Sequence, residues 1–364
     1  MATEQRMQHP FHMYEAILGQ PEALTHAVRR NETAVDQFAA GLAPCERLFI
    51  VGIGTSHHAA QIGEHLMRVY GGGLSTRAVH SFDFALYGPS LTPRDGVIGI
   101  SHRGTKLHTV EALKRAHEAG CCIALITGEG EAARAEYADV TFHTVAQEKS
   151  SAHTISYVGA IAVLACLAER IGYYRTGNSL LSKHFLHNEL PAALRAALAT
   201  ESDIASLARE HFGRRRFWLV GGGPSAINAH EIALKIKETS YLQAAGMPIE
   251  TMLHGPFQCT EAEDLFILIA PEGAAQRRVV ELAGLVKEIG ATYLVVSDGT
   301  PQSLRSDAAG WCVVPAVPEP FSALTCLIPL QLFAYHLALE RGTNPDRFRL
   351  DDPRFARAYA LVRL

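Results

Sequence analysis

The sequence lacks the features that mark secreted, membrane-spanning or nucleic-acid-binding proteins. Its seven cysteines form no CxxC pair and lie mostly within apolar runs, which predicts reduced core residues rather than disulfides. The amino-terminal residues contain no apolar core of signal-peptide length, and the longest apolar stretch, Ile155–Leu167, looks too short and interrupted to span a bilayer. A net charge of −4 favours neither nucleic acid nor an anionic membrane as a partner. We therefore expect a soluble, cytoplasmic protein.

An internal repeat organises the chain. The segment LFIVGIGTS at Leu48–Ser56 returns as FWLVGGGPS at Phe217–Ser225, 169 positions later (217 − 48 = 169). GVIGISHRG from Gly96 pairs with LFILIAPEG from Leu265 at the same spacing (265 − 96 = 169), and CIALIT pairs with TYLVVS at a spacing of 170 (292 − 122 = 170). Landmarks in one order at a nearly constant spacing predict an internal duplication.

Each repeat copy alternates short apolar runs with amphipathic stretches. Apolar residues recur at helical spacing in Ala59–Val69, Val110–Glu118 and Val279–Ile289. Continuous apolar strands that alternate with helices indicate a parallel sheet covered on both faces. The fold class is therefore α/β, with two tandem domains that are each a doubly wound parallel sheet in a three-layer αβα sandwich. Ligands of such domains bind beyond the carboxyl ends of the strands, at a topological switch point.

We expect five regions along the chain. They are an N-terminal helical segment at 1–44, a first α/β domain at 45–184, a helical connector at 185–212, a second α/β domain at 213–343 and a C-terminal tail at 344–364.

The first repeat copy carries a candidate anion site. Two of its predicted strands end in glycine-, hydroxyl- and cation-rich loops just before a helix. Hydroxyls, free backbone N–H groups and cations at adjacent strand ends can together hold a phosphate. The alternative is that these Ser and Thr residues only cap two helices. The candidate ligands are Gly54, Thr55, Ser56, Ser101, His102, Arg103, Thr105 and Lys106.

The second repeat copy has lost this chemistry. Gly221–Ser225 keeps the glycine turn, but the partner loop Ala270–Gly273 offers a carboxylate and no hydroxyl. The first copy is therefore expected to bind the anion, and the second to supply scaffold or catalytic groups.

Three competing motifs fail. The spacing Gly221-x-Gly223-x-x-Ala226 fits a dinucleotide fingerprint, but the run after its helix does not look like a strand ending in Asp or Glu. His230-Glu231 begins like a zinc-protease helix and lacks the second His. No GxSxG nucleophile elbow is present. We expect neither a metal nor an organic cofactor.

Candidate catalytic residues gather within Ala229–Phe257. Lys235 and Glu238 share one helix face, to which Glu231 adds a further polar position. The alternative is an ordinary solvated Glu–Lys pair. His254 lies in a His-Gly-Pro turn, and a lone His in such a turn is more often structural than catalytic. A carboxylate base and a His are the minimum equipment for moving a proton between adjacent carbons of an open-chain sugar.

At these residues the chain resembles the sugar isomerase (SIS) family over nearly its whole length. The matching motifs are Met13–Pro21, Gly52–Ser56, Ala233–Tyr241, His254–Pro256 and Asn344–Asp346. The chain is similar to tandem SIS proteins such as the isomerase domain of glucosamine-6-phosphate synthase, and to phosphosugar isomerases, deaminases and deglycases.

The resemblance implies a role for each candidate. Ser56 and the loop 101–106 would bind the phosphate of a phosphosugar, with Thr55 beside the sugar. Glu238 would carry a proton between C1 and C2 through an enediol, and Lys235 would share its pocket. His254 would assist ring opening from the neighbouring subunit, which implies a homodimer.

The sequence departs from the family pattern at several points. The family loop S-Q-S-G-E-T is here Ser101–Lys106, which is more cationic and predicts a more highly charged or differently placed anion. Ser151 is the candidate ligand from the family's S-T-K segment, whose lysine is missing here. Residues 346–364 contain no lysine, which weakens a case for synthase-type amino transfer, and Ala2 offers no N-terminal Cys nucleophile. Glutamine-dependent activity is expected to be absent.

Two functions remain open. The first is an aldose–ketose isomerase, or an aminosugar-phosphate deaminase or deglycase that uses the same enediol chemistry. The second is a non-catalytic sugar-phosphate sensor. Retention of Lys235, Glu238 and His254, and the lack of a helix-turn-helix segment outside the repeat copies, favour the enzyme.

Overall fold

The computed structural model describes residues 5–130, 136–299 and 301–362, so Ala2 and the last two residues of the tail lie outside it. The chain divides into two compact units, each built from separate stretches of sequence. We call them the first unit (residues 19–148, 153–191 and 357–362) and the second unit (5–18, 149–152 and 192–356). The first unit contains the first repeat copy, and the second unit contains the second.

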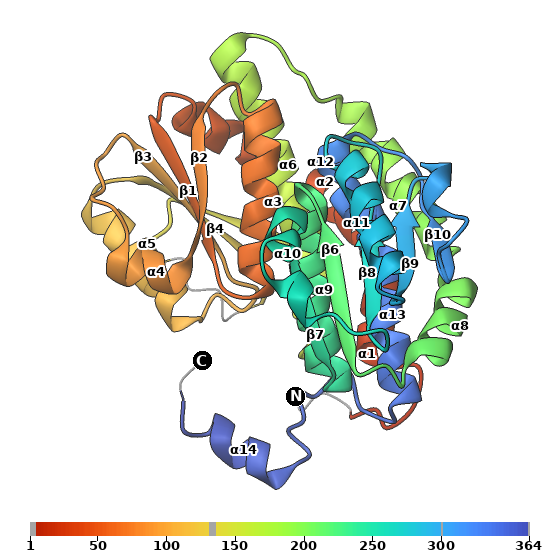
Figure 1. Cartoon of the computed structure of the whole chain (residues 1–364). Helices are drawn as coiled ribbons and strands as arrows, with labels where there is room; N and C mark the ends of the chain where they lie inside the picture. The colour runs from red at the N-terminus through yellow and green to blue at the C-terminus, as the bar shows by residue number, and fades with distance from the viewer. Residues whose placement is uncertain (1–4, 131–135, 300, 363–364) are drawn as a thin grey trace. The chain divides into compact units, whose positions relative to one another are not determined.

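The first unit is a three-layer sandwich around a parallel sheet of order β2-β1-β3-β4-β5 (Figure 1). Helices α2, α3 and α6 cover one face, while α4 and α5 pack with the core of the other. The elements are α2 Gln20–Leu42, β1 Arg47–Gly52, α3 Thr55–Tyr70, β2 Ser75–His80, α4 Ser81–Tyr87, β3 Asp95–Ile100, α5 Leu107–Glu118, β4 Cys122–Glu129, β5 Val140–Ala146, α6 Ile155–Thr176 and the π-helix η1 Phe185–Glu189.

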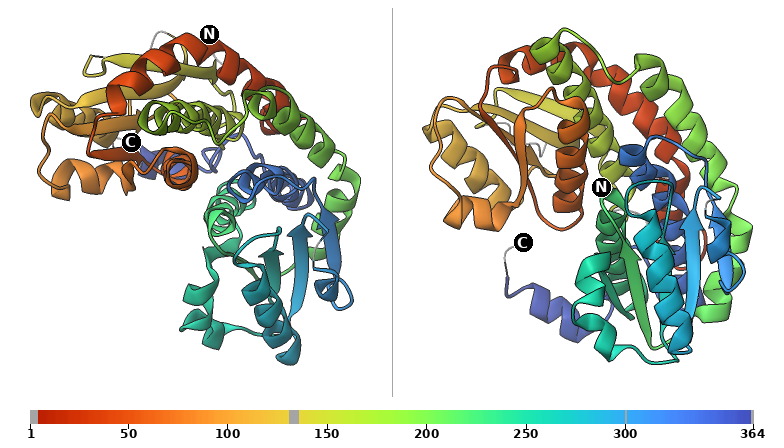
Figure 2. Two further views of the ribbon diagram at one scale, coloured as in Figure 1. Left: turned by 90° about the horizontal axis from the view of Figure 1, so that it is seen from above. Right: turned by 45° about the horizontal axis from the view of Figure 1, so that its top comes forward.

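The second unit repeats this arrangement with sheet order β7-β6-β8-β9-β10, again parallel. Both views of Figure 2 show helices on the two faces of each sheet. The elements are α1 His12–Leu18, α8 Glu201–His211, β6 Arg216–Gly221, α9 Pro224–Ser240, β7 Gln243–Pro248, α10 Ile249–Leu253, η2 Pro256–Cys259, β8 Leu265–Ile269, α11 Gln276–Glu288, β9 Thr292–Ser297, η3 Gln302–Leu304, β10 Gly310–Val313, α12 Glu319–Thr325 and α13 Leu327–Glu340. Helix α7 (Leu190–Leu198) crosses the boundary in sequence, and α14 (Pro353–Tyr359) follows α13.

The predicted α/β class, the two doubly wound sheets and the duplication are confirmed. The strand-to-helix turns match in detail, because Gly54 has φ 57° and ψ −127° while Gly223 has φ 54° and ψ −127°. A side chain on Gly52 or Gly221 would come within 2.5 or 2.7 Å of the following helix backbone. Only glycine allows the helix to approach the strand this closely, so the glycine pattern of each copy dictates where its first helix starts.

An ion pair between a partly exposed arginine and a buried aspartate is also duplicated, and the sequence analysis did not find it. Arg47 Nε donates to Asp95 at 2.7 Å in the first unit, and Arg216 Nε donates to Asp264 at 2.8 Å in the second. Both carboxylates are nearly inaccessible to solvent. Each pair joins the starts of two neighbouring strands, β1 with β3 and β6 with β8, and so holds their register.

The edge strands β2 and β7 were not predicted. Their residues are mostly half-buried or exposed, so neither strand has the continuous apolar run that marks the central strands. Strand β7 follows α9, the helix that begins after the Gly221–Gly223 turn, at a place where the sequence analysis did not predict a strand. It ends at Pro248 rather than at an acidic residue, which leaves the dinucleotide fingerprint incomplete.

Two helical stretches are long and apolar enough to cross a membrane by length and composition. They are Ile155–Thr176 and Glu319–Glu340, each of 22 residues. In both, 89% of the most apolar window is buried inside the protein, as expected for the central helix of an α/β unit. The sequence-based argument that the stretch from Ile155 is too short to span a bilayer was therefore wrong, and burial is the feature that explains its composition.

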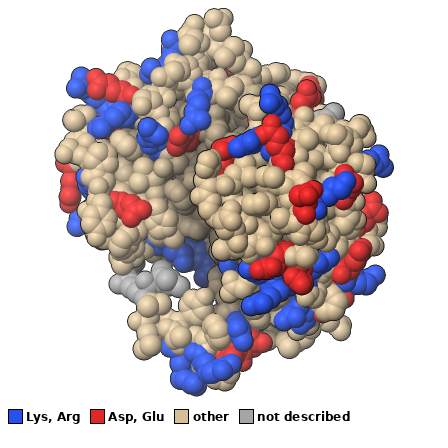
Figure 3. Space-filling model, in the orientation of Figure 1, with Lys and Arg blue, Asp and Glu red and all other residues tan. Residues whose placement is uncertain are grey.

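The visible surface is electrostatically mixed. On the face drawn in Figure 3, Lys and Arg side chains are interspersed with Asp and Glu side chains. This distribution agrees with 33 basic residues set against 37 acidic ones in the whole chain.

The Arg47–Asp95 pair predicts a pH-dependent contribution to stability. Burial alone would raise the pKa of Asp95, but the Arg47 ion pair and the Thr92 N–H hydrogen bond lower it below its ordinary 3.8. An Asp95→Asn variant should lose about 1.5–3 kcal/mol of unfolding free energy at pH 7. Since the folded-state pKa is depressed, this loss should stay constant down to about pH 4 and shrink below it.

Urea unfolding followed by circular dichroism at pH 3–8 measures this effect. The control is Asp307→Asn, which removes only an exposed ion pair with Lys287 and should change stability by about 0.5 kcal/mol or less. A loss for Asp95→Asn no larger than that of the control would contradict the structural role of the pair.

Candidate functional site

A small cavity lies at the carboxyl ends of the strands of the first unit. In this sheet order the winding reverses between β1 and β3, the position at which doubly wound folds bind ligands. The cavity is lined by the start of α3, which follows β1, by the end of β3 and by residues of β4, β5 and α6. Its volume is about 20 Å³, enough for a water-sized group. The expected location of the ligand site therefore coincides with a cavity.

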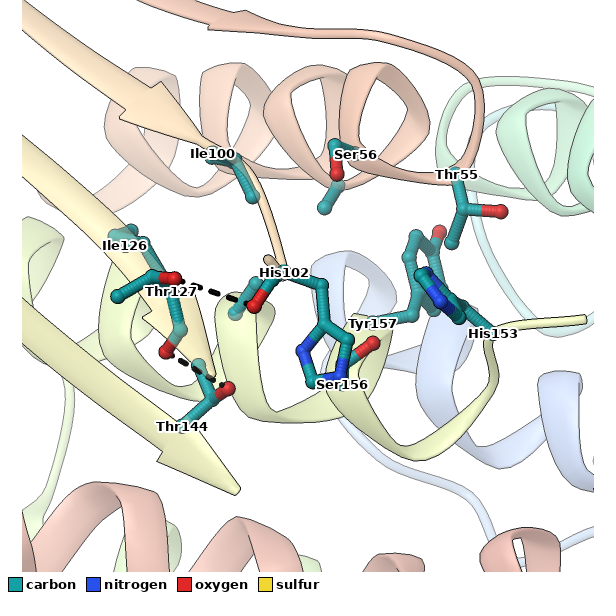
Figure 4. Close-up of a pocket in the computed structure, with 12 residues that line it drawn as sticks. Thr55, Ser56, Ile100, His102, Ile126, Thr127, Thr144, His153, Ser156 and Tyr157 are labelled. Atoms are coloured by element: carbon teal, nitrogen blue, oxygen red, sulfur yellow. Dashed lines mark hydrogen bonds between the residues drawn. The ribbon is translucent and has the colours of Figure 1, made fainter. Parts of the chain in front are cut away.

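The cavity is lined from five elements and their loops (Figure 4). Three of the predicted ligands, Thr55, Ser56 and His102, are among its walls. Five further polar residues line it that the sequence analysis missed: Thr127, Thr144, His153, Ser156 and Tyr157. Thr127 closes the apolar run of β4, so a hydroxyl at the end of a third strand was the signal available in the sequence.

The first turn of α3 presents the paired hydroxyls of Thr55 and Ser56. Gly54 is its N-cap residue and accepts N–H bonds from His57 at 2.9 Å and His58 at 3.1 Å. No acidic residue lies in this first turn, so the positive end of the helix dipole is uncompensated there. Of the features of the candidate anion site, this helix N-terminus is the one that the geometry supports most directly.

The loop after β3 separates into a buried and an exposed half. Ser101 is buried, its N–H donates to Ile126 O at 3.0 Å, and its hydroxyl has no hydrogen-bond partner among the described residues. Arg103 and Thr105 are exposed to solvent rather than lining the cavity. Lys106 is half-buried at the start of α5, and burial followed by the charge of Arg103 lowers its pKa. The predicted cations therefore stand outside the cavity wall.

His102 is held firmly in that wall. Its ring Nε2 accepts the N–H of Glu148 at 2.8 Å, and its carbonyl accepts the N–H of Gly128 at 2.9 Å. The Gln147 side chain donates to the same carbonyl at 2.9 Å. These bonds fix both the backbone and the ring of His102 against the ends of β4 and β5.

A buried carboxylate caps the neighbouring helix α6. Glu148 accepts the N–H of Thr154 at 2.9 Å and of Ser156 at 3.0 Å, and also the Ser156 hydroxyl. The N-terminus of α6 is thus already neutralised by a side chain of the protein. Sequence analysis missed Glu148 because it lies six residues before Thr154, outside the usual capping-box spacing.

Ser151, the remaining predicted ligand, belongs to the second unit. Its N–H donates to the carbonyl of Asp346 at 3.0 Å. The Asp346 carboxylate in turn accepts the N–H groups of His12 and Met13, each at 2.9 Å, at the start of α1. The Asn-Pro-Asp motif therefore has a structural function, which is to cap α1 and to hold the segment 149–152.

The predicted catalytic pair forms a buried triad on α9. Lys235 Nζ lies 2.8 Å from Glu238 and 3.3 Å from Glu231. The side chains of Lys235 and Glu231 are 1% and 0% exposed, whereas Glu238 is 19% exposed. Burial by itself would lower the pKa of Lys235, but the two carboxylates hold it above its ordinary value. The alternative of a solvated pair is therefore wrong, because Lys235 is buried between two carboxylates that favour its charged form.

His254 stands apart from this triad in its exposure. It ends α10, its side chain is 76% exposed, and Nε2 lies 3.3 Å from Glu250 on the same helix. Gly255 follows with φ 143°, a conformation that turns the chain sharply. The predicted His-Gly-Pro turn is confirmed, while the contribution of His254 across a subunit interface stays a prediction.

The fold defines the class of this protein, and a match to a family sequence model defines its family. Two parallel sheets of the same strand order, each with a glycine turn leading into its first helix, define a tandem-repeat α/β protein. The chain belongs to the SIS domain family, whose sequence model matches residues 41–170 and 212–341.

Curated relatives match most of the chain. Glutamine--fructose-6-phosphate aminotransferase [isomerizing] from Pyrococcus horikoshii is 30% identical over 338 residues, which cover 93% of this chain and 56% of the relative. The protein of the same name from Thermococcus kodakarensis is 29% identical over 345 residues, 94% of this chain and 57% of the relative. The chain thus spans just over half the length of these relatives.

Solved structures share the fold. The C-terminal domain of glucosamine-fructose-6-phosphate aminotransferase from Francisella tularensis superposes with a TM-score of 0.84 at 19% identity, covering 94% of this chain and all of that one. Tagatose-6-phosphate ketose/aldose isomerase from Escherichia coli gives 0.79 at 19% identity, with 94% and 97% covered. Glucosamine-6-phosphate deaminase from Thermotoga maritima gives 0.74 at 20% identity, with 92% and 96% covered. At these identities the likeness concerns the fold.

The α9 triad predicts a large effect of removing its cation. A Lys235→Met variant leaves two carboxylates together in a buried site and should lose about 3–5 kcal/mol of unfolding free energy at pH 7.5. The loss should be smaller at pH 5, because two facing carboxylates without a cation bind a proton in the folded state at higher pH than in the unfolded state. Urea unfolding at the two pH values measures it.

Lys237, two residues further along α9, provides the matched control. It is exposed on the same helix, so Lys237→Met should change stability by about 0.5 kcal/mol or less. Equal effects of the two substitutions would show that Lys235 is not the buried partner of the two carboxylates.

Proposed function

We propose that this chain is a phosphosugar enzyme that moves a proton between adjacent carbons of an open-chain sugar phosphate. The reaction is an aldose–ketose isomerisation, or the deamination or deglycation of an aminosugar phosphate through the same enediol or enediolamine. The observation that carries the proposal is the α9 triad, in which a buried cation lies between two carboxylates and only Glu238 has appreciable exposure.

Glu238 is the proposed base. Its carboxylate takes the proton from the carbon beside the carbonyl, and the electron pair of that C–H bond forms the enediolate. The same carboxyl group returns the proton to the neighbouring carbon, so that one residue serves both half-reactions. Its partial exposure provides access to substrate, and its hydrogen bond to Lys235 fixes its orientation.

Lys235 supplies charge rather than an amine nucleophile. Because its pKa is held above the ordinary value, it remains an ammonium ion at physiological pH. A fixed positive charge in a buried site stabilises the negative oxygen that develops as the enediolate forms. Schiff-base chemistry at Lys235 would need the neutral amine, which this setting disfavours.

The anion of the substrate is assigned to the first unit. Thr55 and Ser56 provide hydroxyls at the α3 N-terminus, and His102 lines the same cavity. The same loop also provides the buried Ser101. Arg103 and Thr105 form the exposed outer part of that loop and are followed by the half-buried Lys106. The two cations Arg103 and Lys106 would raise the local concentration of anions. Ser151, which lies in the segment 149–152, remains a proposed ligand of the anion.

His254 is proposed to assist opening of the sugar ring within a homodimer. An imidazole can transfer a proton to or from the ring oxygen near neutral pH. Its high exposure in the single chain leaves it accessible to a second copy. Glutamine-dependent amino transfer, which the names of the curated relatives include, lies outside the proposal because the chain spans 56–57% of those relatives.

Deuterium exchange tests the proposal directly. The protein is incubated in D₂O with fructose 6-phosphate, tagatose 6-phosphate and glucosamine 6-phosphate, and deuterium at C1 and C2 is measured by NMR. An enzyme of this class should incorporate deuterium into at least one of them. A Glu238→Gln variant should bind that sugar unchanged within a few-fold and exchange about 10²–10⁴-fold more slowly.

An exposed glutamate on α11 supplies the control, since Glu288→Gln should exchange at the wild-type rate. Sugar binding without exchange in the wild type would favour the sensor over the enzyme. Exchange that survives in Glu238→Gln within a few-fold would show that the base is assigned wrongly.

A further inference from the structure

A second cavity lies within the first unit, between helices α2 and α6 and the π-helix η1. Its volume is about 450 Å³, which is in the range of cavities that bind small molecules. In the described part of the chain, no residue lines both this cavity and the small one at the strand ends, although α6 contributes to each. We call it the α2–α6 cavity.

The two helices place acidic residues on the faces that line this cavity, where packed helices usually carry apolar residues. On α2, the acidic Glu32 and Asp36 lie at i+4 and i+8 from Val28, so the three share one face. On α6, Glu169 follows Cys166 at i+3. The cavity is therefore lined by three carboxylates from two neighbouring helices.

Two of these carboxylates have a cation of their own. Lys183 Nζ lies 2.9 Å from Glu32, and Arg170 Nε lies 2.7 Å from Asp36. The Arg170 guanidinium is held in this position, because it also packs over two tyrosine rings of α6 at 4.5 and 5.1 Å. Both cations are therefore engaged by carboxylates other than Glu169.

Glu169 is the carboxylate that keeps unused acceptor capacity. Its side chain is 4% exposed, and Oε1 accepts the Ser179 hydroxyl at 2.7 Å. Arg170 Nη1 lies 3.7 Å from the same oxygen, beyond hydrogen-bond distance. The other oxygen, Oε2, makes no hydrogen bond within the described residues. A buried carboxylate without a close cation is costly, and a ligand that supplies a cation removes that cost.

The electrostatic environment of the cavity favours a positive ligand. The pKa of the Cys166 thiol is raised to about 12, first by burial and then by the carboxylates of Glu169 and Glu32, while Lys183 opposes them. The carboxylates therefore outweigh the lysine at this thiol. Three carboxylates and two permanently charged cations line the cavity, so its formal charge is also negative.

The remaining walls favour an organic ligand. Val28, Val35 and Leu186 line the cavity and are each at most 3% exposed. Leu186 lies in the π-helix, in which the N–H of Leu190 donates to the carbonyl of Phe185, and single π-turns are frequent at functional sites. Within the described residues, no three His, Cys, Asp or Glu side chains are grouped so as to hold a metal ion.

We propose that the α2–α6 cavity is a second ligand site, which binds a small organic ammonium ion. The ammonium group donates to Glu169 Oε2 and completes the hydrogen bonding of a buried carboxylate. The apolar part of the ligand packs against Val28, Val35 and Leu186. Binding there requires no phosphosugar, so it is independent of the proposed reaction.

Matched pairs of amines and alcohols test the site. Benzylamine, cyclohexylamine and 3-methylbutylamine are each compared with the alcohol of the same shape, and binding to the full chain is measured by saturation-transfer NMR at pH 7.5. At least one amine should bind with a Kd of about 1 mM or below, and about tenfold or more tightly than its alcohol. The reason is that a charged donor makes the stronger hydrogen bond to a carboxylate.

A Glu169→Gln variant keeps the shape of the side chain and removes its charge. It should bind that amine about ten- to a hundredfold more weakly than the wild type, and the alcohol within about threefold of it. Glu111→Gln, at an exposed position of α5, is the matched control and should bind both probes like the wild type.

Unfolding separates a ligand site from a purely structural carboxylate. Because Glu169 has no close cation, Glu169→Gln should unfold at the same urea concentration as the wild type or at a higher one. The amine should raise the unfolding midpoint of the wild type and leave that of the variant unchanged, since only the wild type binds it well. A lowered midpoint with unchanged amine affinity would show that Glu169 only supports the fold.

Thiol labelling uses the wild-type protein alone and does not depend on the folding of a variant. Cys166 lines the cavity, so a saturating amine should slow its alkylation by iodoacetamide severalfold, as measured by peptide mass spectrometry. The exposed Cys259 of the second unit is the internal control and should be alkylated at an unchanged rate.

Three results would overturn the inference. The first is that all three amines bind no more tightly than their alcohols. The second is that Glu169→Gln binds the amine within about threefold of the wild type. The third is that a bound amine leaves the alkylation of Cys166 unchanged.

Discussion

The close approach of a helix to a strand end is the constraint on which both halves of the molecule depend. A Cβ on Gly52 or Gly221 would lie 2.5 or 2.7 Å from the backbone of the helix that follows, so each of these helices can begin only because glycine precedes it. That start places Thr55 and Ser56 in the wall of the cavity at the carboxyl ends of the strands of the first sheet. On the other sheet the same start sets the direction of α9, along which Lys235 lies about three turns and Glu238 about four turns from the first residue.

Much of the fold could be predicted from sequence because the signals are local and repeated. Apolar runs such as Leu48–Val51 form buried strands and glycine turns mark the helix starts, so the duplication predicts two sheets of the same kind. The edge strand β7 could not be predicted, since its residues face partly to solvent and carry no continuous apolar pattern. The Arg47–Asp95 pair was also out of reach, because its partners lie 48 residues apart and meet only through strand pairing.

The candidate site was predictable in residue type but not in arrangement. Hydroxyls after β1 and β3 predicted an anion site, and the spacing of Lys235 and Glu238 predicted that they share one helix face. Sequence could not tell which members of the 101–106 loop turn inward, because burial depends on β4 and β5 beyond it. It also could not reveal Glu148, whose carboxylate reaches the start of α6 from a preceding loop.

The division of the chain into units has a consequence for its architecture. The second unit takes residues 5–18 from before the first repeat copy and 149–152 from within it, and the Asp346 carbonyl and carboxylate hold both segments. A duplication that began as two consecutive copies is now interlaced, so a single cut of the backbone between residues 191 and 192 would leave each fragment without part of a folded unit. The halves can be traced separately in sequence, but they are not separable modules.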